Sequence, residues 1–332
     1  MQSILHPIIG PADPPQEDLS GRTVFVTGGA LGIGYETSRN LALQKARVIM
    51  LNRKEDQGDD AISKIQAEAK EQRISVDINW VQLDLGNLNM VQEVFTRLSK
   101  EEERCDLFFA NGAINANQPG LDADGIDRHF GVNCLGHFLA INLLLPLMRK
   151  TSKIPGAPAP RIVFESSEQH RLAPSNVHFG SLRELNDPNI DNTQIYCRTK
   201  LGMILYTKYL VNDIIGPNKD NIYVLAVHPG AVNTAMQQQW ESAYPGLTGK
   251  IIKNVSLALG RDPEQGSYAG LWAAISPEII EKGYNGYYFT DPGQLGKESS
   301  QANDPWLQWA CWDLSERLVK EKLGSDALLP WK

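Results

Sequence analysis

A short apolar segment that leads directly into a cluster of glycines constrains the fold of this chain more than any other feature. After Arg22 the sequence reads TVFVTGGALGIGYE. The β-branched and aromatic residues predict a buried strand, and the glycines that follow permit a tight turn into a helix. Backbone N–H groups at the start of that helix would face a phosphate group. The segment therefore predicts a nucleotide-binding unit, with candidate binding residues Gly28, Gly32, Ile33 and Gly34.

The rest of the chain continues this alternation of strand-like and helix-like segments. A βαβα pattern predicts a parallel sheet with helices on both faces. We therefore expect a single α/β domain of the Rossmann type, with a doubly wound sheet of about seven strands. Further strand-like runs lie at 47–53, 74–85, 105–113, 161–167, 221–230 and 285–291, and helix-like runs at 34–46, 59–72, 88–103, 130–148 and 195–215. The expected parts are an N-terminal arm (1–20), the domain (21–332), a substrate-loop region (about 235–262) and a C-terminal helical extension (about 295–332).

Composition excludes several classes of function. The 332 residues carry a formal net charge of −7, so no basic field is available for nucleic acid or an anionic membrane. The richest apolar run, Phe138–Met148, is too short to span a bilayer and predicts a buried helix. The N-terminus lacks the pattern of a secretory signal, and the four cysteines have no C-x-x-C spacing. We expect a cytoplasmic protein with reduced thiols and no membrane anchor.

Three histidines raise the question of a metal site. His170, His178 and His228 have neither an i, i+4 pairing nor a carboxylate cluster beside them. We therefore expect no metal cofactor.

The end of the second strand-like run indicates which dinucleotide would bind. An NAD-binding unit places Asp or Glu about 20 residues after the glycines, where it hydrogen-bonds the ribose 2′-hydroxyl. This chain has Arg53 and Lys54 at that point. A guanidinium suits a 2′-phosphate, so NADP(H) is favoured over NAD(H). The alternative is that Arg53 merely ends a strand in solvent.

A tyrosine and a lysine four residues apart form the candidate catalytic pair. Tyr196 and Lys200 would share one helix face, which places a phenol beside an ammonium group. A free phenol has a pKa of about 10, and the charge of Lys200 would lower that pKa and ease proton transfer. A lone Y-x-x-x-K pattern is common, however, so the rest of the chain has to decide its meaning.

Seven motifs, taken in order, resemble those of a known family. They are TGGALGIG, LDL at 83–85, ANGA at 110–113, VNCLGHF at 132–138, RIVFESS, YCRTK and HPGAVNT at 228–234. In this order they resemble the short-chain dehydrogenase/reductase family, and VNCLGHF, HPGAV and YCRTKL are most similar to its retinol-dehydrogenase-like branch. The resemblance implies hydride transfer between NADP(H) and a carbonyl/alcohol pair.

The resemblance also implies four catalytic roles. Tyr196 would be the general acid in reduction and the base in oxidation, and Lys200 would also bind the nicotinamide ribose. Ser167 would hydrogen-bond the substrate carbonyl, although Ser166 is the alternative at that place. Asn133 would hold the helix backbone and a water in the proton relay.

Further cofactor contacts follow from the same resemblance, at the adenine, its ribose and the nicotinamide. For each of these loop residues the alternative is ordinary turn or helix-cap chemistry. The set comprises Asp84 and Leu85 at the adenine, Asn111 at its ribose, Pro229, Gly230 and Thr234 at the nicotinamide, and the catalytic Tyr196 and Lys200.

Two departures from the family pattern need a structural answer. Ala110 stands where the family usually has asparagine, which could alter how the fourth strand is braced. The distance from Ser167 to Tyr196 is 196 − 167 = 29 positions, longer than the family's minimal spacing. The added residues could form a wall of the substrate pocket.

The substrate is less constrained than the chemistry. Trp240 and Tyr244 are candidates to cover an apolar substrate, with the docking of a partner as the alternative. We expect an NADPH-dependent reductase of a hydrophobic ketone or aldehyde, such as a specialised metabolite. Two alternatives stay open: oxidation of a retinoid- or steroid-like alcohol, and a redox-inactive NADP-binding sensor or scaffold.

The C-terminal tail carries three tryptophans at helical spacing. Trp306, Trp309 and Trp312 lie in an amphipathic segment, and we expect one face of it to pack on the domain. Peripheral membrane contact is the alternative. The family commonly dimerises through the helices expected at 130–148 and 196–215, so a homodimer is a candidate assembly here.

Overall fold

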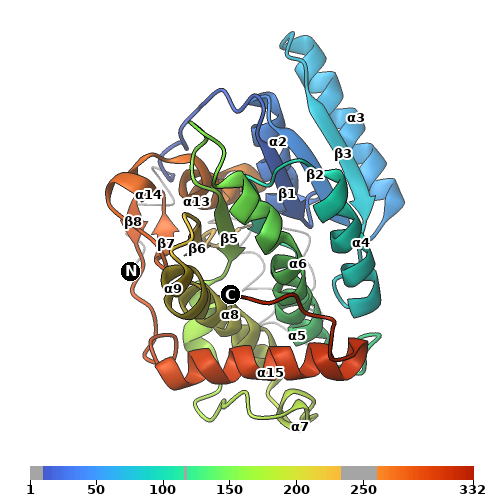
Figure 1. The fold of residues 1–332 in the computed structure, drawn as a ribbon, viewed down its shortest axis with the longest axis vertical. Coiled ribbons are helices and arrows are strands. Elements are labelled where there is room, and N and C mark those ends of the chain that lie inside the picture. The colour runs from blue at the N-terminus through green and yellow to red at the C-terminus, as the bar shows by residue number, and fades with distance from the viewer. Residues whose placement is uncertain (1–9, 116–117, 233–259) are drawn as a thin grey trace.

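An eight-stranded sheet forms the centre of the molecule (Figure 1). The computed structural model describes residues 10–115, 118–232 and 260–332. The strand order is β3-β2-β1-β4-β5-β6-β7-β8, and the pairings are parallel except for that of β7 with β8. The predicted doubly wound sheet is therefore confirmed. The strands are β1 (Thr23–Thr27), β2 (Arg47–Asn52), β3 (Asp77–Gln82), β4 (Leu107–Ala110), β5 (Arg161–Glu165), β6 (Tyr223–Val227), β7 (Tyr288–Asp291) and β8 (Gln294–Leu295).

The short β8 strand is the one that the sequence did not predict. It pairs antiparallel with β7, and both of its residues are exposed. Two residues carry too little alternation to be recognised as a strand. The other seven strands match the predicted runs.

Helices connect the strands and account for most of the other residues that the structure describes. Within these described residues, two of the helical segments are π-helical, and one is a 3-10 helix. The helices are α2 (Gly32–Leu43), α3 (Glu55–Glu71), α4 (Leu88–Glu101), α5 (Arg128–Phe130), η1 (Gly131–Leu135, π), α6 (Gly136–Thr151), η2 (Glu168–Leu172, 3-10), α7 (Leu182–Leu185), α8 (Asn192–Tyr209), η3 (Leu210–Ile215, π), α9 (Gly216–Asn218), α13 (Pro263–Ile275), α14 (Glu278–Glu281) and α15 (Pro305–Leu323).

Each face of the sheet has its own apolar core. Phe25 of β1 belongs to the core that contains the buried side chains of α4, α6, α8 and α15. Its neighbours Val24 and Val26 belong to the core shared with α2, α3 and α13. Side chains alternate along a strand, so β1 contributes to both cores. This double burial explains why its sequence is apolar without interruption.

Helix α3 begins four residues before the predicted start at residue 59. Glu55 and Asp56 occupy its first turn, where carboxylates interact favourably with the helix dipole. The sequence predicts a polar helix around 59–72, and this first turn lies just before that range.

A continuous helical run passes through α5, η1 and α6, from Arg128 to Thr151. By length and composition this run could cross a membrane, but 89% of its most apolar window is buried inside the protein. The prediction of a buried helix at 138–148 is confirmed. The run begins two residues before and ends three residues after the helix predicted at 130–148, and its polar residues His137 and Asn142 are buried as well.

The tail helix α15 lies against α8 and extends the core (Figure 1). Trp312 packs edge-on against Phe138, with ring centroids 4.8 Å apart, and stacks on Tyr209 at 4.8 Å. The predicted packing of the tail is confirmed for this face, whereas Trp306 and Trp309 are about half exposed. Because α15 covers side chains of both α6 and α8, a homodimer formed through those two helices would have to accommodate it.

The described part of the N-terminal arm has no helix or strand. In residues 10–19, the backbone N–H of Leu19 donates to the carbonyl oxygen of Gln44 at 2.8 Å, and the Leu19 side chain is fully buried. The arm is therefore attached to the domain at the end of α2.

Candidate active site

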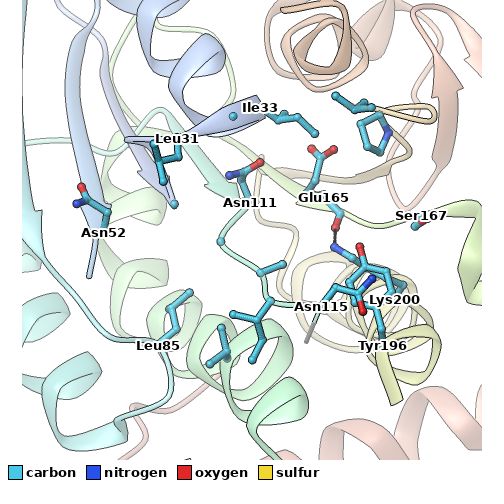
Figure 2. Close-up of a pocket in the computed structure, with 18 of the residues that line it drawn as sticks. Leu31, Ile33, Asn52, Leu85, Asn111, Asn115, Glu165, Ser167, Tyr196 and Lys200 are labelled. Atoms are coloured by element: carbon cyan, nitrogen blue, oxygen red, sulfur yellow. Dashed lines mark hydrogen bonds between the residues drawn. The ribbon is translucent and has the colours of Figure 1, made fainter. Parts of the chain in front are cut away.

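A cavity of about 620 Å³ opens at the carboxyl ends of the central strands (Figure 2). It is lined by residues that follow β1, β2, β4, β5 and β6, the edge at which open α/β sheets bind ligands. Of the predicted site residues that the structure describes, Gly34 and Asn133 do not line it. The others do: Gly28, Gly32, Ile33, Arg53, Lys54, Asp84, Leu85, Asn111, Ser167, Tyr196, Lys200, Pro229 and Gly230.

The glycines after β1 let the chain turn tightly at one wall of the cavity. Gly28 has a φ of +64° and Gly32 a φ of +55°, which residues with side chains rarely adopt. A Cβ atom on Gly34 would lie 2.2 Å from the carbonyl oxygen of Gly28. Gly34 therefore shapes the loop from behind, and no larger residue fits its position.

The N-terminus of α2 opens toward the cavity. Its N-cap residue, Leu31, provides no side-chain hydrogen bond to the first turn. Leu31, Gly32 and Ile33 all line the cavity. Backbone N–H groups that no side chain caps, at the positive end of a helix dipole, are suited to bind a phosphate.

Two exposed cations stand at the end of β2. Arg53 and Lys54 line the cavity, and among the described residues neither forms an ion pair with a carboxylate. Asn52 fixes the backbone here, because its Nδ2 donates to the carbonyl oxygen of Lys54 at 2.7 Å. The buried Oδ1 of Asn52 has no hydrogen-bond partner within the described part of the chain. This end of the cavity therefore offers positive charge and an unused acceptor.

Asp84 and Leu85 lie where β3 leads into α4. The Asp84 carboxylate accepts a hydrogen bond from the backbone N–H of Gly86 at 2.9 Å, so this residue also stabilises the turn. Leu85 packs beside Gly112, where an added Cβ would lie 2.9 Å from Leu85 Cδ1. Both residues reach the cavity as predicted.

Thr27 braces the end of β4 and answers the question raised by Ala110. The Thr27 Oγ1 atom lies 3.0 Å from each of the backbone nitrogens of Asn111 and Gly112. His137 Nε2 lies 2.8 Å from the same oxygen. Ala110 is fully buried in the strand. The loop after β4 is thus held without a polar side chain at position 110.

Tyr196 and Lys200 lie one turn apart on α8, and both face the cavity. The Lys200 amine lies 5.3 Å from the centroid of the Tyr196 ring and donates to the backbone carbonyl oxygen of Glu165. Lys200 is only 2% exposed. Figure 2 shows the two side chains close together, with the Lys200 amine directed toward the end of β5.

The pKa of Tyr196 shifts in the direction opposite to the sequence expectation. Burial, followed by the nearby Glu165 carboxyl, raises the pKa of Tyr196. Burial also lowers the pKa of Lys200, whose amine hydrogen-bonds a carbonyl oxygen. The expected lowering is wrong for the protein alone, because ionising a buried phenol costs more than the neighbouring ammonium returns. A phenol that stays neutral at neutral pH is a proton donor.

The two serines at the end of β5 differ in their partners. The Ser166 hydroxyl donates to the carbonyl oxygen of Lys200 at 2.8 Å, so its proton is committed to the backbone. The Ser167 hydroxyl oxygen caps η2 by accepting from the N–H of Gln169 at 3.1 Å. Because Ser167 accepts in this hydrogen bond, its own hydroxyl proton stays available to a ligand in the cavity. The geometry favours Ser167 as the donor to a substrate oxygen.

Asn133 lies behind the cavity, in the π-helical segment η1. Its Oδ1 accepts from the backbone N–H of Ile114 at 2.8 Å, and its Nδ2 lies 3.0 Å from both Ile114 O and Thr199 Oγ1. The side chain therefore ties the loop after β4 to the helix that carries Tyr196. The expected contact of Asn133 was with helix backbone. The backbone that it contacts is instead that of Ile114, in the loop after β4.

The residues added between Ser167 and Tyr196 are mostly packed away from the cavity. Only the first of them, Glu168 and Gln169, line it among the described residues. Arg198, which is 1% exposed, holds the later part by donating to the carbonyl oxygen of Leu185 at 2.8 Å. The described part of the insertion thus forms little of the cavity wall.

Two buried titratable residues that line the cavity were not predicted as site residues. Glu165 ends β5 and is 7% exposed, and His228 follows β6. Burial lowers the pKa of His228 to about 4, so this imidazole is neutral. A glutamate beside two serines carries no sequence signal of burial, since the elements that cover it are far away in the chain.

Three predicted residues and the metal expectation complete the comparison with the sequence. Thr234, Trp240 and Tyr244 lie outside the described residues. Within the described ranges, no group of three His, Cys, Asp or Glu side chains is placed to hold a metal ion. His170 instead hydrogen-bonds the carbonyl oxygen of Ser167 at 2.7 Å.

Known proteins resemble this chain over most of its length. A family profile described as short chain dehydrogenase matches residues 22–176. Polyprenol dehydrogenase from Danio rerio is 31% identical over 92% of this chain and 89% of its own. Retinol dehydrogenase 13 from Mus musculus is 30% identical over 94% of this chain and 88% of its own. The chain belongs to the short-chain dehydrogenase/reductase family.

Solved structures of short-chain dehydrogenases and similar proteins share the fold. An uncharacterised protein from Mycobacterium paratuberculosis superimposes with a TM-score of 0.66 at 25% identity, over 92% of this chain and 96% of its own. A short-chain dehydrogenase from Escherichia coli CFT073, solved in complex with NADPH, has a TM-score of 0.60 at 23% identity, over 83% and 99% of the two chains. This short-chain dehydrogenase/reductase is therefore an oxidoreductase acting on an alcohol/carbonyl pair, most similar to the retinol-dehydrogenase-like branch.

Proposed function

We propose that the chain is an NADPH-dependent reductase that transfers hydride to a hydrophobic ketone or aldehyde. The observation that carries this proposal is one continuous cavity with two different ends. Arg53 and Lys54 stand at one end, and Ser167, Tyr196 and Lys200 stand at the other. Membership of an alcohol/carbonyl oxidoreductase family supports the reaction class.

The described residues fit a bound NADP(H). The N-terminus of α2, which no side chain caps, suits the pyrophosphate, and the Arg53 guanidinium suits a 2′-phosphate. The unpartnered Oδ1 of Asn52, which precedes Arg53 in the sequence, supplies a buried hydrogen-bond acceptor at the end of β2. The NADPH in the Escherichia coli relative supports the same assignment. When bound, this cofactor supplies the hydride from its nicotinamide.

The catalytic side chains provide the proton and hold the substrate oxygen. Tyr196 donates its phenolic proton to the carbonyl oxygen as negative charge develops there. The phenol is protonated at neutral pH, which is the state that reduction requires. Ser167 donates a hydrogen bond to the same oxygen. The ammonium of Lys200 stabilises the phenolate that remains.

Asn133 acts through other residues. It connects Ile114 of one wall to Thr199 on the helix that carries Tyr196 and Lys200. We assign it the role of a positioning residue that keeps the cavity wall and α8 in register.

One of the two alternative functions has support of its own. Oxidation of a lipid-like alcohol is supported by the names of the polyprenol and retinol dehydrogenases among the relatives. A redox-inactive NADP-binding sensor is the alternative from a different class of function. The assembled set of Asn133, Ser167, Tyr196 and Lys200 argues against that alternative, because cofactor binding alone does not need a proton donor.

Location and assembly belong to the same proposal. The four cysteines are buried free thiols, which suits a reducing compartment such as the cytoplasm. A homodimer is proposed with the qualification that α15 covers α8. Size measurement by light scattering separates a monomer from a dimer.

The test of the proposed function is cofactor consumption with a panel of carbonyl compounds. Purified protein should oxidise NADPH when at least one hydrophobic ketone or aldehyde is present, and should use NADH less well. Faster reduction of NADP⁺ with long-chain alcohols would favour the dehydrogenase function instead. Tight NADPH binding without turnover of any compound in either direction would favour the sensor.

A further inference from the structure

The cavity contains a buried carboxyl group that the proposed mechanism does not use. Glu165 is the last residue of β5 and is 7% exposed. Its Oε1 atom is buried and has no hydrogen-bond partner within the described part of the chain. A buried polar atom without a partner is costly, so its presence in a cavity wall calls for an explanation.

The position of this carboxyl group places it at the catalytic end of the cavity. The backbone carbonyl oxygen of Glu165 accepts the hydrogen bond of the Lys200 amine. Figure 2 shows its carboxyl group directed away from Lys200, toward the side of the cavity where Ile33 lies. A Cβ atom on Gly270 would lie 3.8 Å from Glu165 Oε2, so α13 approaches the carboxyl from behind. The group therefore lies between the glycine loop, the sheet and α13.

Among the described residues no charged group forms an ion pair with the Glu165 carboxyl, although the charge of Lys200 lowers its pKa. Lys200 on α8 is the nearby cation, but its amine is bound to the backbone oxygen of Glu165. Tyr196 on the same helix keeps its proton because its pKa is raised. His228 at the end of β6 is neutral, and Glu168 is engaged with Arg171 and Tyr288. Burial raises the pKa of Glu165 above the usual carboxyl range.

We propose that Glu165 sets the preference of the cavity between the two redox states of its nicotinamide cofactor. The oxidised nicotinamide ring carries a positive charge, and the reduced ring is neutral. An ionised carboxylate beside the ring therefore stabilises the oxidised form and favours departure of the hydride toward the carbonyl carbon. The hydride leaves with both electrons, so the ring is oxidised and the carbonyl is reduced. Tyr196 supplies the proton to the new alcohol oxygen, and the proton that Glu165 loses as it ionises passes to solvent. This inference rests on the proposed function for the presence of the cofactor.

The proposal also predicts that binding of the oxidised cofactor is coupled to the release of a proton. A carboxyl group that is neutral in the free protein must lose its proton to pair with the oxidised ring. Binding of NADP⁺ should therefore release a proton and strengthen as pH rises, whereas binding of NADPH should do neither. Titration of the 2′-phosphate affects both cofactors alike and cancels in the ratio of their dissociation constants.

The experiment measures that ratio by calorimetry or by quenching of tryptophan fluorescence, at about pH 6 and about pH 9. For the wild-type protein, the Kd of NADP⁺ divided by that of NADPH should fall by about tenfold from low to high pH. Glu165→Gln should reduce this change to the part contributed by Lys200, whose pKa is lowered by burial. The matched control is Glu168→Gln, which removes a carboxylate of the same cavity that Arg171 already pairs, and should retain the wild-type pH dependence.

A second measurement keeps the test decisive if Glu165→Gln fails to fold. Calorimetric titration of the wild-type protein with NADP⁺, in two buffers with different ionisation enthalpies, should show proton release near neutral pH. A ratio that does not change with pH and no proton release would overturn the proposal. Failure of both cofactors to bind would instead contradict the proposed function, and binding without turnover would leave the ratio as a valid test of Glu165.

Discussion

The two ends of the cavity differ in how they hold charge. At the end of β2, Arg53 and Lys54 are exposed and stand in solvent. At the end of β5, Glu165 and Lys200 are almost fully buried. Exposed charges interact weakly and are screened by salt, whereas buried charges interact strongly and change protonation state. The exposed end can therefore select the cofactor through small differences in binding free energy. The buried end can control the chemical step.

The largest expected effect is at the buried end, in the proton donor. Tyr196→Phe removes the phenolic proton and should lower kcat by about 10³-fold while NADPH still binds, because general acid catalysis contributes that order of rate. The control is Tyr209→Phe, which changes a tyrosine of the same helix that stacks on Trp312 away from the cavity. Turnover with Tyr196→Phe equal to that of the control would contradict the assignment.

Acid should destabilise the buried end through its neutral histidines. Burial lowers the pKa values of His137 and His228 to about 4. At these two histidines the unfolded chain binds more protons than the folded protein between pH 6.5 and 4, so their contribution to stability falls as pH falls through that window. Glu165, whose pKa is raised, contributes in the opposite direction. Each histidine should cost about 2 kcal/mol by about pH 5.

The free energy of unfolding in urea, measured at about pH 7 and about pH 5, checks this expectation. His228→Asn should show a smaller loss over the same interval than the wild-type protein does. An equal loss in both proteins would show that His228 is not the group that titrates.

At the exposed end, the expected effect is smaller and specific to the 2′-phosphate. Arg53→Ala should raise the Kd of NADPH by about tenfold and leave that of NADH nearly unchanged. Lys70→Ala is the control, since Lys70 is an exposed cation of α3 that does not line the cavity. Equal weakening of both cofactors by Arg53→Ala would remove the basis for the NADP(H) preference.

The smallest expected effect is that of salt. Raising the ionic strength from about 0.05 M to about 0.5 M should weaken NADPH binding severalfold, because the cations at the end of β2 are screened. The value of kcat at saturating cofactor should stay constant, since Lys200 is shielded from solvent. A fall in kcat of the same size as the change in Kd would erase the distinction between the two ends.

The sequence predicted the exposed end of the site more completely than the buried one. The glycine loop joins β1 to α2, and Arg53 and Lys54 follow the next strand, β2. The local sequence therefore contains the whole arrangement. The pairing of Tyr196 with Lys200 could also be predicted from local sequence, because the two residues lie one helical turn apart. These features depend on neighbouring residues, which a sequence displays directly.

The buried end depends on contacts between distant residues. Thr27 meets His137 across 110 positions, and the carboxyl of Glu165 is covered by α13, near Gly270. The raised pKa of Tyr196 comes from burial that several elements create together. No local pattern encodes these contacts, which explains why the shift in pKa was predicted with the wrong sign and why Glu165 was missed.

The most direct test of the account follows the hydride itself. NADPH carrying deuterium at the reactive carbon of the nicotinamide is incubated with the protein and a carbonyl compound that it turns over, and the product is analysed by mass spectrometry. The account predicts an alcohol with one deuterium on the former carbonyl carbon, formed by the wild-type protein and at most in trace amounts by Tyr196→Phe. Cofactor oxidation without deuterium in the alcohol would contradict hydride transfer within this cavity.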